Sequence, residues 1–443
     1  MPASKPALWI ATAAGVSIAC VSPPDGAARV EASLAERVDV AATASAPPLG
    51  ELQDENALVA LALRNNAGFR ASLAELGIAE AEWLRAGGLP PVSFSMLFPL
   101  GSKQLEYAAK FPVDVIWLRP RRVAAAKRDW EATAERVVQH GLDVVRAVRV
   151  ACAERAAAGE RFAVSKRGAE LAFAEFTEKR FRAGAVAENA VAAARVRAAA
   201  VSDRAEQEQA RMRAAEARLA ELTGAARAAP EGCRPRLDAP SQLPSPDALV
   251  EQALAARPDL RAAELTLEAA AQRAGLARRE IFQLIAVFDA NGSGANFEAG
   301  PGIELPIPLD GARAARRAAD AKLEQAGAGY QAALAAAARE VREAHASASA
   351  AASSLNAWQS ERMPQLAAWK RRAAAAFETG GIDRGALLEA EIAHDSGTLA
   401  ATDARFAWRR AHAELERAVG GQIGGAPVVR APVTTPPANA VSR

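Results

Sequence analysis

The sequence predicts a mainly α-helical protein with a smaller membrane β part, built from two copies of one structural unit. Each unit contains a helix, a β-hairpin, a long helix and a last helix. Three observations predict this fold: a helix-forming composition, an internal repeat, and short segments in which apolar and polar residues alternate. The copies span residues 51–228 and 247–424, with a Pro-rich connector at 229–246 between them.

The composition favours helices and excludes several classes of function. The 443 residues are 51% hydrophobic, 24% charged and 5% aromatic, and Ala, Leu, Glu and Arg are abundant, as in long helices and coiled coils. With Lys+Arg 54 against Asp+Glu 52, the charge gives no general affinity for nucleic acid. The His and Cys residues are isolated, so we expect no metal site and no other cofactor. Because nucleophile motifs and nucleotide loops are missing from the sequence, we expect no catalytic residues and no enzyme activity.

The N-terminus has the pattern of an export signal, which we place at residues 1–19. Lys5 precedes an apolar run from Ala7 to Ile18 that is too short to span a bilayer. Two interpretations of the next residue, Cys20, stay open. It is either the palmitate-carrying N-terminus of a lipoprotein or a plain residue after cleavage at Ala19. Residues 20–50 read as a linker, lipid-anchored in the first case, and residues 425–443 as a disordered tail.

The repeat is visible as an ungapped alignment at an offset of 191 residues, beginning with Ala57 over Ala248. The offset rises to 194 and then 196 along the chain, as expected for small insertions in a duplicated unit. In each copy a first helix of about 30 residues is predicted to end near Ala86 or Glu280. The informative identities are Leu58 with Leu249, Val59 with Val250, Leu63 with Leu254, Arg70 with Arg261, and Leu76 with Leu267.

The long helix of each copy is predicted to begin near Arg121 or Gly311 and to continue to Gly184 or Gly380. About 60 residues at 1.5 Å per residue span about 90 Å, far more than the width of a globular domain. The last helix then returns to Gly224 or Gly420. Apolar residues at seven-residue spacing predict packing seams in these helices. The seam residues are Val123, Trp130, Val137, Val144 and Ala151 in the first copy, and Ile392, Leu399, Phe406 and Ala413 in the second.

The two hairpins are predicted at residues 91–117 and 281–310. Phe94, Met96 and Phe98 share one face of the first strand, and Tyr107, Phe111 and Trp117 one face of the second. Strands of about ten residues with one apolar and one polar face are typical of transmembrane β-barrels. Two hairpins alone would leave unpaired backbone groups in lipid, so the barrel must be shared among several copies of the chain. A half-buried hairpin outside a membrane fits the alternation equally well.

The order of these elements resembles the TolC family of bacterial outer-membrane efflux proteins. The resemblance covers residues 50–424 and rests on LGIAEAEWLRAGGLPP, ALAARPDLRAAELTLEAA and GIELPIPLDGARAARRAADAKLEQA. It implies a homotrimer, with four strands per subunit in a 12-stranded β-barrel in outer-membrane lipid, continued by an α-helical barrel in the periplasm. It also implies a passive exit duct of a tripartite efflux system. In such a system a periplasmic adaptor docks on the helical tips and an inner-membrane pump supplies the energy.

The candidate functional residues lie at these tips, where FRAGAVAENAVAAAR and FETGGIDRGALLEAE resemble the paired tip motifs of the family. Glycine tolerates the positive φ of a tight reversal, so we assign the tip turns and adaptor docking to Gly184, Gly380 and Gly381. The tip and gate residues are Glu188, Asn189, Asp383 and Arg384. Three copies of Asp383 would form an acidic ring that pairs with Arg384 of a neighbouring subunit. The alternative is that Asp383 is only the N-cap of the last helix.

Two other functions remain as alternatives. The chain could be an exported structural coiled-coil protein without a membrane barrel, or the exit duct of a type I protein secretion system. The transported substrate is left open by the sequence, as is the question of whether Cys152 and Cys233 pair.

Overall fold

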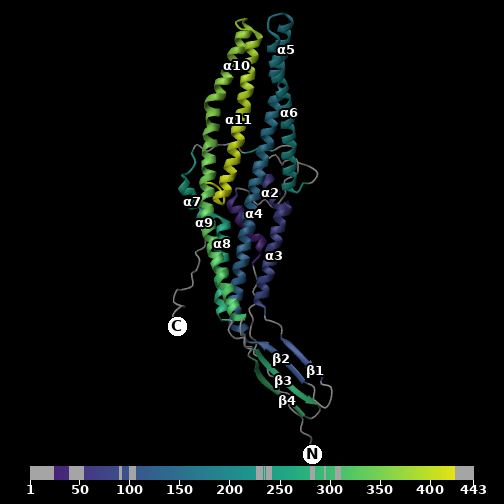
Figure 1. Ribbon diagram of the computed structural model, residues 1–443, viewed down its shortest axis with the longest axis vertical. Helices are drawn as coiled ribbons and strands as arrows, with labels where there is room; N and C mark the ends of the chain where they lie inside the picture. The colour runs from purple at the N-terminus through teal and green to yellow at the C-terminus, as the bar shows by residue number, and fades with distance from the viewer. Residues whose placement is uncertain are drawn as a thin grey trace, which may run out of the picture.

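The protein is an elongated rod with a β-sheet at one end and two helical tips at the other (Figure 1). The computed structural model describes residues 24–38, 54–88, 92–98, 106–225, 233, 235, 242–279, 285–293, 296–304 and 311–424. The predicted signal peptide, Cys20 and the C-terminal tail from residue 425 lie outside the described residues.

The predicted order of elements occurs twice along the chain. The first copy contains α2 (Glu55–Asn65), α3 (Ala67–Gly87), β1 (Ser93–Leu97), β2 (Glu106–Pro112), α4 (Val115–Lys166), α5 (Ala169–Arg182) and α6 (Glu188–Thr223). The second contains α7 (Pro246–Ala256), α8 (Pro258–Arg279), β3 (Ile285–Ser293), β4 (Asn296–Glu304), α9 (Gly311–Ala357), a π-helical turn (Trp358–Arg362), α10 (Met363–Glu378) and α11 (Arg384–Val419).

The four strands form one antiparallel sheet in the order β1-β2-β3-β4, with β1 and β4 as outer strands. Phe94 pairs with Ala109, which pairs with Phe288, so these residues share a face. That face is apolar and exposed in the single chain: Phe94 is 65% and Ile303 is 77% exposed. The opposite face carries Ser93, Ser95 and the ion pair between Lys110 and Glu304.

The first hairpin is shorter than predicted. The ladder between β2 and β3 ends at Pro112, because proline has no N–H with which to continue it. Helix α4 begins at Val115, so Trp117 lies in the first helical turn and not on the strand. The start of the long helix predicted near Arg121 is therefore six residues too late.

The first helix of each copy is two helices, not one. In the first copy, α2 ends at Asn65, and the side chain of Asn66 accepts a hydrogen bond from the Phe69 N–H (2.9 Å), which caps α3. In the second copy, α7 ends before Arg257 and α8 begins at Pro258. Proline favours the first position of a helix and disfavours helical backbone before it.

The long helices are also interrupted, contrary to the prediction of continuous helices. Gly168 has φ of 78° and separates α4 from α5. At the matching place in the second copy, Pro364 follows a π-helical turn at residues 358–362. Proline cannot donate the usual backbone hydrogen bond, and the wider turn accommodates that loss. The two copies therefore break the same helix in different ways.

The predicted linker contains a helix, α1 (Gly26–Arg37), which corrects the assignment of residues 20–50. Val30, Leu34 and Val38 follow a four-residue spacing and are buried against α3 and α4. Asp25 caps the helix by accepting hydrogen bonds from the backbone N–H groups of Ala27 and Ala28. The high Ala, Pro and Ser content of the wider segment concealed this short apolar stripe.

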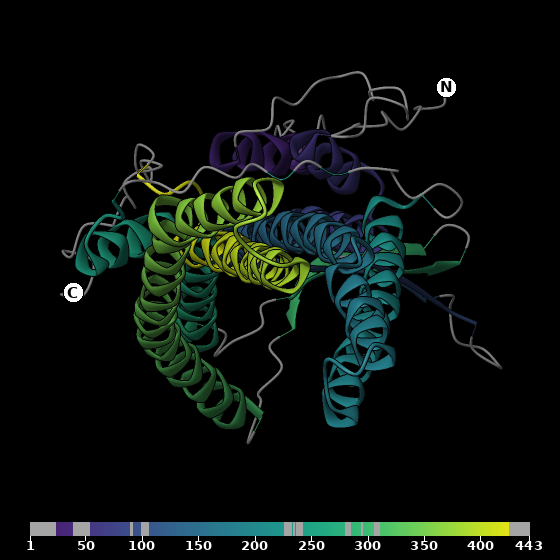
Figure 2. The same ribbon diagram turned by 90° about the horizontal axis from the view of Figure 1, so that it is seen from above.

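The core runs along the middle of the rod. Seen along the long axis, α4 and α11 lie between α9 on one side and α6 on the other (Figure 2). Four of the five predicted seam residues in α4 are buried, with Trp130 and Ala151 almost inaccessible, and Val123 is half-buried. Much of the predicted seam in α11 is only half-buried. None of the helices within the described ranges is both long and apolar enough to cross a membrane.

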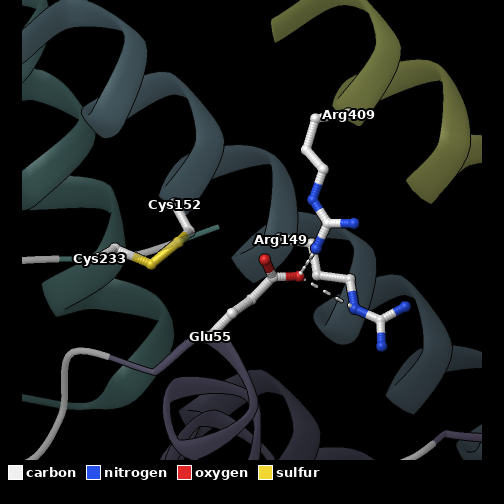
Figure 3. The surroundings of a disulfide bond; sticks show 5 residues. All are labelled: Glu55, Arg149, Cys152, Cys233 and Arg409. Atoms are coloured by element: carbon white, nitrogen blue, oxygen red, sulfur yellow. Dashed lines mark hydrogen bonds and ion pairs between the residues drawn. A yellow bond between two sulfur atoms is a disulfide. The ribbon is translucent and has the colours of Figure 1, made fainter. Parts of the chain in front are cut away.

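A disulfide bond and a buried ionic cluster join segments that are distant in the sequence (Figure 3). Cys152 of α4 is bonded to Cys233 of the connector, with 5.5 Å between the Cα atoms. Beside it, the Glu55 carboxylate contacts Arg149 (3.4 Å) and Arg409. These contacts tie α2, α4, α11 and the connector together.

Candidate functional site at the helical tips

Both helical tips use the same glycine-based turn. Gly184 and Gly380 have φ of 72° and 75°, in the left-handed region that favours glycine. The N–H of Ala185 donates to the Arg180 carbonyl (2.8 Å), and the N–H of Gly381 donates to the Ala376 carbonyl (2.7 Å). These six-to-one hydrogen bonds define a Schellman motif at the end of α5 and of α10. Of the predicted turn residues, Gly381 alone lacks a positive φ.

An ionic bridge joins the two helices of the first tip. Glu178 of α5 contacts Arg195 of α6 (3.1 Å) and Arg182 of its own helix (2.9 Å). Hydrogen bonds from Arg195 and Arg182 to the carboxylate lower the pKa of Glu178. The N-cap residue of α6 is Ala187, which has no side-chain oxygen to cap the helix.

At the second tip, an aspartate side chain caps the helix that follows the turn, α11. Asp383 precedes α11 and accepts a hydrogen bond from the Ala386 N–H (2.9 Å). This is the N-cap role that the sequence left as an alternative. The guanidinium of Arg384 lies over the ring of Phe377, 5.7 Å from its centre. Within one chain, Asp383 and Arg384 therefore have separate contacts.

The two tips also touch each other. Arg180 of α5 lies 3.6 Å from the Asp383 carboxylate. A Cβ atom at Gly385 would be 3.1 Å from the ring of Phe176, so the first turn of α11 packs closely on α5. No local pattern in the sequence indicates Arg180 and Phe176, because both precede the glycine of their own tip by at least four residues and contact the other copy.

The remaining predicted tip residues are exposed. Glu188 and Asn189 lie in the first turn of α6 and point to solvent, and Arg384 is exposed in the first turn of α11. All predicted tip residues thus lie at the same end of the rod, opposite the sheet (Figure 1). In the described ranges no three His, Cys, Asp or Glu side chains lie close enough together to hold a metal ion.

Comparison with known proteins finds a family match in the second half of the chain. Residues 249–421 match the model of the outer membrane efflux protein family. No curated protein sequence matches the chain.

Solved structures match the fold of the whole rod. The outer-membrane channel OprN is 21% identical with a TM-score of 0.68, and the match covers 87% of this chain and 97% of that one. VceC of Vibrio cholerae is 20% identical (TM-score 0.66; 83% and 96% covered), and the Campylobacter jejuni outer membrane channel CmeC is 16% identical (0.68; 83% and 85%). The chain has the fold of outer-membrane efflux channels, and its resemblance to the TolC family is confirmed.

Proposed function

We propose that the chain is the outer-membrane channel of a tripartite efflux system, acting as a passive trimeric exit duct and not as an enzyme. The observation that carries this proposal is the sheet. It has an exposed apolar face and a polar face, with an unpaired strand at each edge of the single chain. Such a sheet is stable in lipid only if its edges close onto further copies. Three copies would give the 12 strands of a closed barrel, continued by the helices into the periplasm.

The same proposal gives the tips a partner. A periplasmic adaptor would dock on the glycine turns at Gly184 and Gly380, and an inner-membrane pump would supply the energy. The exposed charges at this end, on Glu188, Asp383 and Arg384, would lie around the mouth of the trimer. Three Asp383 carboxylates would favour cations there. We further propose that Cys20 carries a lipid that anchors the N-terminus to the outer membrane.

Cell fractionation tests the channel. Cells that express the chain are separated into soluble, inner-membrane and outer-membrane fractions, and each fraction is run on a gel with and without heating. We expect a heat-sensitive trimer in the outer membrane that conducts ions in a planar bilayer. A soluble periplasmic monomer would overturn the proposal in favour of an exported coiled-coil protein.

Two variants test the finer assignments. Cys20→Ala should change the mobility of the mature protein and abolish labelling by palmitate, whereas unchanged processing would exclude the lipid. Asp383→Asn should weaken cation preference of the single-channel conductance. Its matched control is Glu391→Gln, a carboxylate farther along α11 from the tip. Equal cation selectivity in both variants would show that Asp383 does not lie at the mouth.

A further inference from the structure

A group of arginines lies where the helices meet the sheet, at the opposite end from the tips. Helix α4 carries Arg119, Arg121 and Arg122 in its first turns, and α9 carries Arg313, Arg316 and Arg317. Arg119 and Arg122 align with Arg313 and Arg316 at the repeat offset of 194 residues. We call these six side chains the arginine belt.

Contacts with neighbouring helices place each half of the belt beside the end of another helix. Arg119 donates from Nε to the carbonyl of Gly87 at the end of α3 (2.8 Å). The side chain of Arg121 lies against Gly275 of α8, and α8 packs on α9. The start of α4 therefore lies beside the ends of α3 and α8, and the start of α9 lies beside α8, at the end of the rod that carries the sheet (Figure 1).

The chain does little to neutralise this charge. Within the described ranges, no belt arginine has a carboxylate at ion-pair distance, and the nearby Asp320 is paired with Arg278 (3.0 Å). Arg122 Nε and Nη2 and Arg316 Nε are buried without a hydrogen-bond acceptor. Arg313 and Arg317 are exposed.

The position of the belt on its helices adds to this excess of positive charge. The N-terminus of a helix carries a partial positive charge, which favours anions and disfavours arginine. Neither α4 nor α9 has an acidic residue in its first turn. Asp114 precedes α4, but its side chain makes no capping hydrogen bond and its Oδ1 is buried without a partner. Two of the three arginines in each copy match across the repeat, so both copies place cations at a helix start, where an anion from outside the chain would be stabilised.

We propose that the arginine belt binds the phosphate groups of anionic phospholipids on the periplasmic side of the outer membrane. This inference rests on the proposed function, because the apolar face of the sheet must lie in lipid for the belt to reach the headgroups. In both copies the belt lies at the helix end nearest the sheet, so a sheet in lipid would hold it at the depth of the headgroup layer. Guanidinium groups bind phosphate through paired hydrogen bonds, and basic groups near an anionic surface gain affinity from it.

The test uses the full-length trimer in detergent and a variant with Arg313→Gln, Arg316→Gln and Arg317→Gln. Glutamine keeps the helix propensity of arginine. The control is Lys370→Gln, Arg371→Gln and Arg372→Gln, which removes the same charge from α10 near the tips. Thermal unfolding is followed while phosphatidylglycerol, phosphatidylcholine or inorganic phosphate is titrated, because a ligand of the folded state raises the melting temperature.

We expect phosphatidylglycerol to raise the melting temperature of the wild type and of the control at the same lipid concentration. Each arginine near an anionic surface is worth roughly fivefold in affinity, so the belt variant should need on the order of 100-fold more lipid. Phosphatidylcholine and inorganic phosphate should have little effect on any form. An equal response of the belt variant and the control to phosphatidylglycerol would overturn the inference. A wild type that responds to inorganic phosphate as strongly as to phosphatidylglycerol would also overturn it.

Single-channel conductance distinguishes a failure of this inference from a failure of the proposed function. If the wild type forms no membrane trimer, the proposed function fails. If the wild type conducts and the belt variant changes its anion selectivity while lipid binding is unaltered, the belt faces the channel interior. That result would overturn the lipid assignment and leave the exit duct intact.

Discussion

In each copy, the residue between the first two helices donates a hydrogen bond to the end of the last helix, but a different residue does so in each. We call this contact the joint of the copy. In the first, the Asn66 side-chain amide donates to the carbonyl of Leu222 (3.1 Å); in the second, Arg257 donates to the carbonyl of Ala418 (3.1 Å). These carbonyls occupy matching positions near the ends of α6 and α11. The last carbonyls of a helix lack partners within the helix. Both copies supply a hydrogen-bond donor to such a carbonyl, but the residue that donates differs between them.

The surroundings of the two joints differ in their chemistry. Arg257 also contacts Asp259 and Glu340 (3.0 Å), and Arg37 of α1 donates to the Gly420 carbonyl (3.0 Å). Asn66 makes neutral hydrogen bonds, and its joint belongs to the core that contains the disulfide. At this joint the first copy therefore combines neutral hydrogen bonds with a disulfide in the same core, whereas the second copy uses a charged arginine and its ion pairs. Five predictions test or sharpen this contrast.

Loss of the disulfide should have the largest effect, and only the first copy has this bond. Cys152 matches Ala348 of the second copy, and both side chains are fully buried. In the chain-entropy description, a link across 81 residues contributes about 4–5 kcal/mol to the free energy of unfolding. Replacing both cysteines by alanine should lower the midpoint of denaturant unfolding accordingly. The reduced wild type should unfold like the variant, and a variant as stable as the oxidised protein would contradict the contrast.

Close packing between α10 and α11 is the next largest difference between the copies. A Cβ atom at Gly397 would overlap Leu366, whereas Val201 occupies the matching position in α6. Introducing that residue as Gly397→Val should cost about 1–3 kcal/mol through overpacking. Gly159→Val in α4 is the control, because no neighbour lies within 4 Å of the added Cβ atom. Equal unfolding midpoints for the two variants would show that α10 moves aside freely.

Breaking the neutral joint should cost less. Asn66→Ala removes the cap of α3 and the hydrogen bond to Leu222, and loss of an N-cap typically costs about 1 kcal/mol. Asn65→Ala is a matched control, since it keeps the Cβ atom next to Gly224. Urea unfolding of both variants measures the difference. A loss that is no larger for Asn66→Ala than for its neighbour would contradict the role assigned to this side chain.

Much of this architecture could be predicted from the sequence because it depends on periodicity and on glycine. Gly224 and Gly420 end the last helices in the left-handed conformation, as the repeat indicates. The alternation of Phe94, Met96 and Tyr107 predicts the apolar face of the sheet. At the tips, the glycine spacing predicts the turns, but the contact of Arg180 with Asp383 depends on how two copies pack in space.

The features that the sequence does not predict depend on contacts between distant segments or on weak local signals. Pairing of Cys152 with Cys233 requires the connector to fold back on α4, and no local pattern specifies that path. The break at Gly168 was missed because a single glycine inside a helical pattern is often tolerated. Helix α1 has only a short buried stripe. Local signals thus predict the elements, whereas contacts between distant segments need the tertiary structure.

The ionic joint should respond to pH and the neutral joint should not. Burial acts to raise the pKa of Asp259, but the hydrogen bond and charge of Arg257 outweigh it and hold that pKa below its ordinary value of 3.8. Stability from this pair is therefore fully present above about pH 4, and it is lost as the pH falls towards the pKa of the folded state. The difference in unfolding midpoint between wild type and Asp259→Asn should shrink from pH 7 to pH 3. For Asn66→Ala it should stay constant.

The smallest expected effect concerns the two tips. Ala187 and Asp383 have the same extended backbone before α6 and α11, with ψ of 159° and 169°, but Asp383 alone supplies a cap. Transferring that cap as Ala187→Asp should stabilise the first tip by up to about 1 kcal/mol.

Hydrogen exchange at the start of α6 measures this local effect. Ala187→Asn is the matched control, because asparagine caps a helix without adding charge. Equal protection in both variants would assign the gain to the hydrogen bond. A gain with aspartate alone would assign it to the helix dipole and to nearby arginines. Unchanged protection in both would mean that the first tip is already held by the bridge from Glu178 to Arg195, and that the duplicated tips reached equal stability by unequal means.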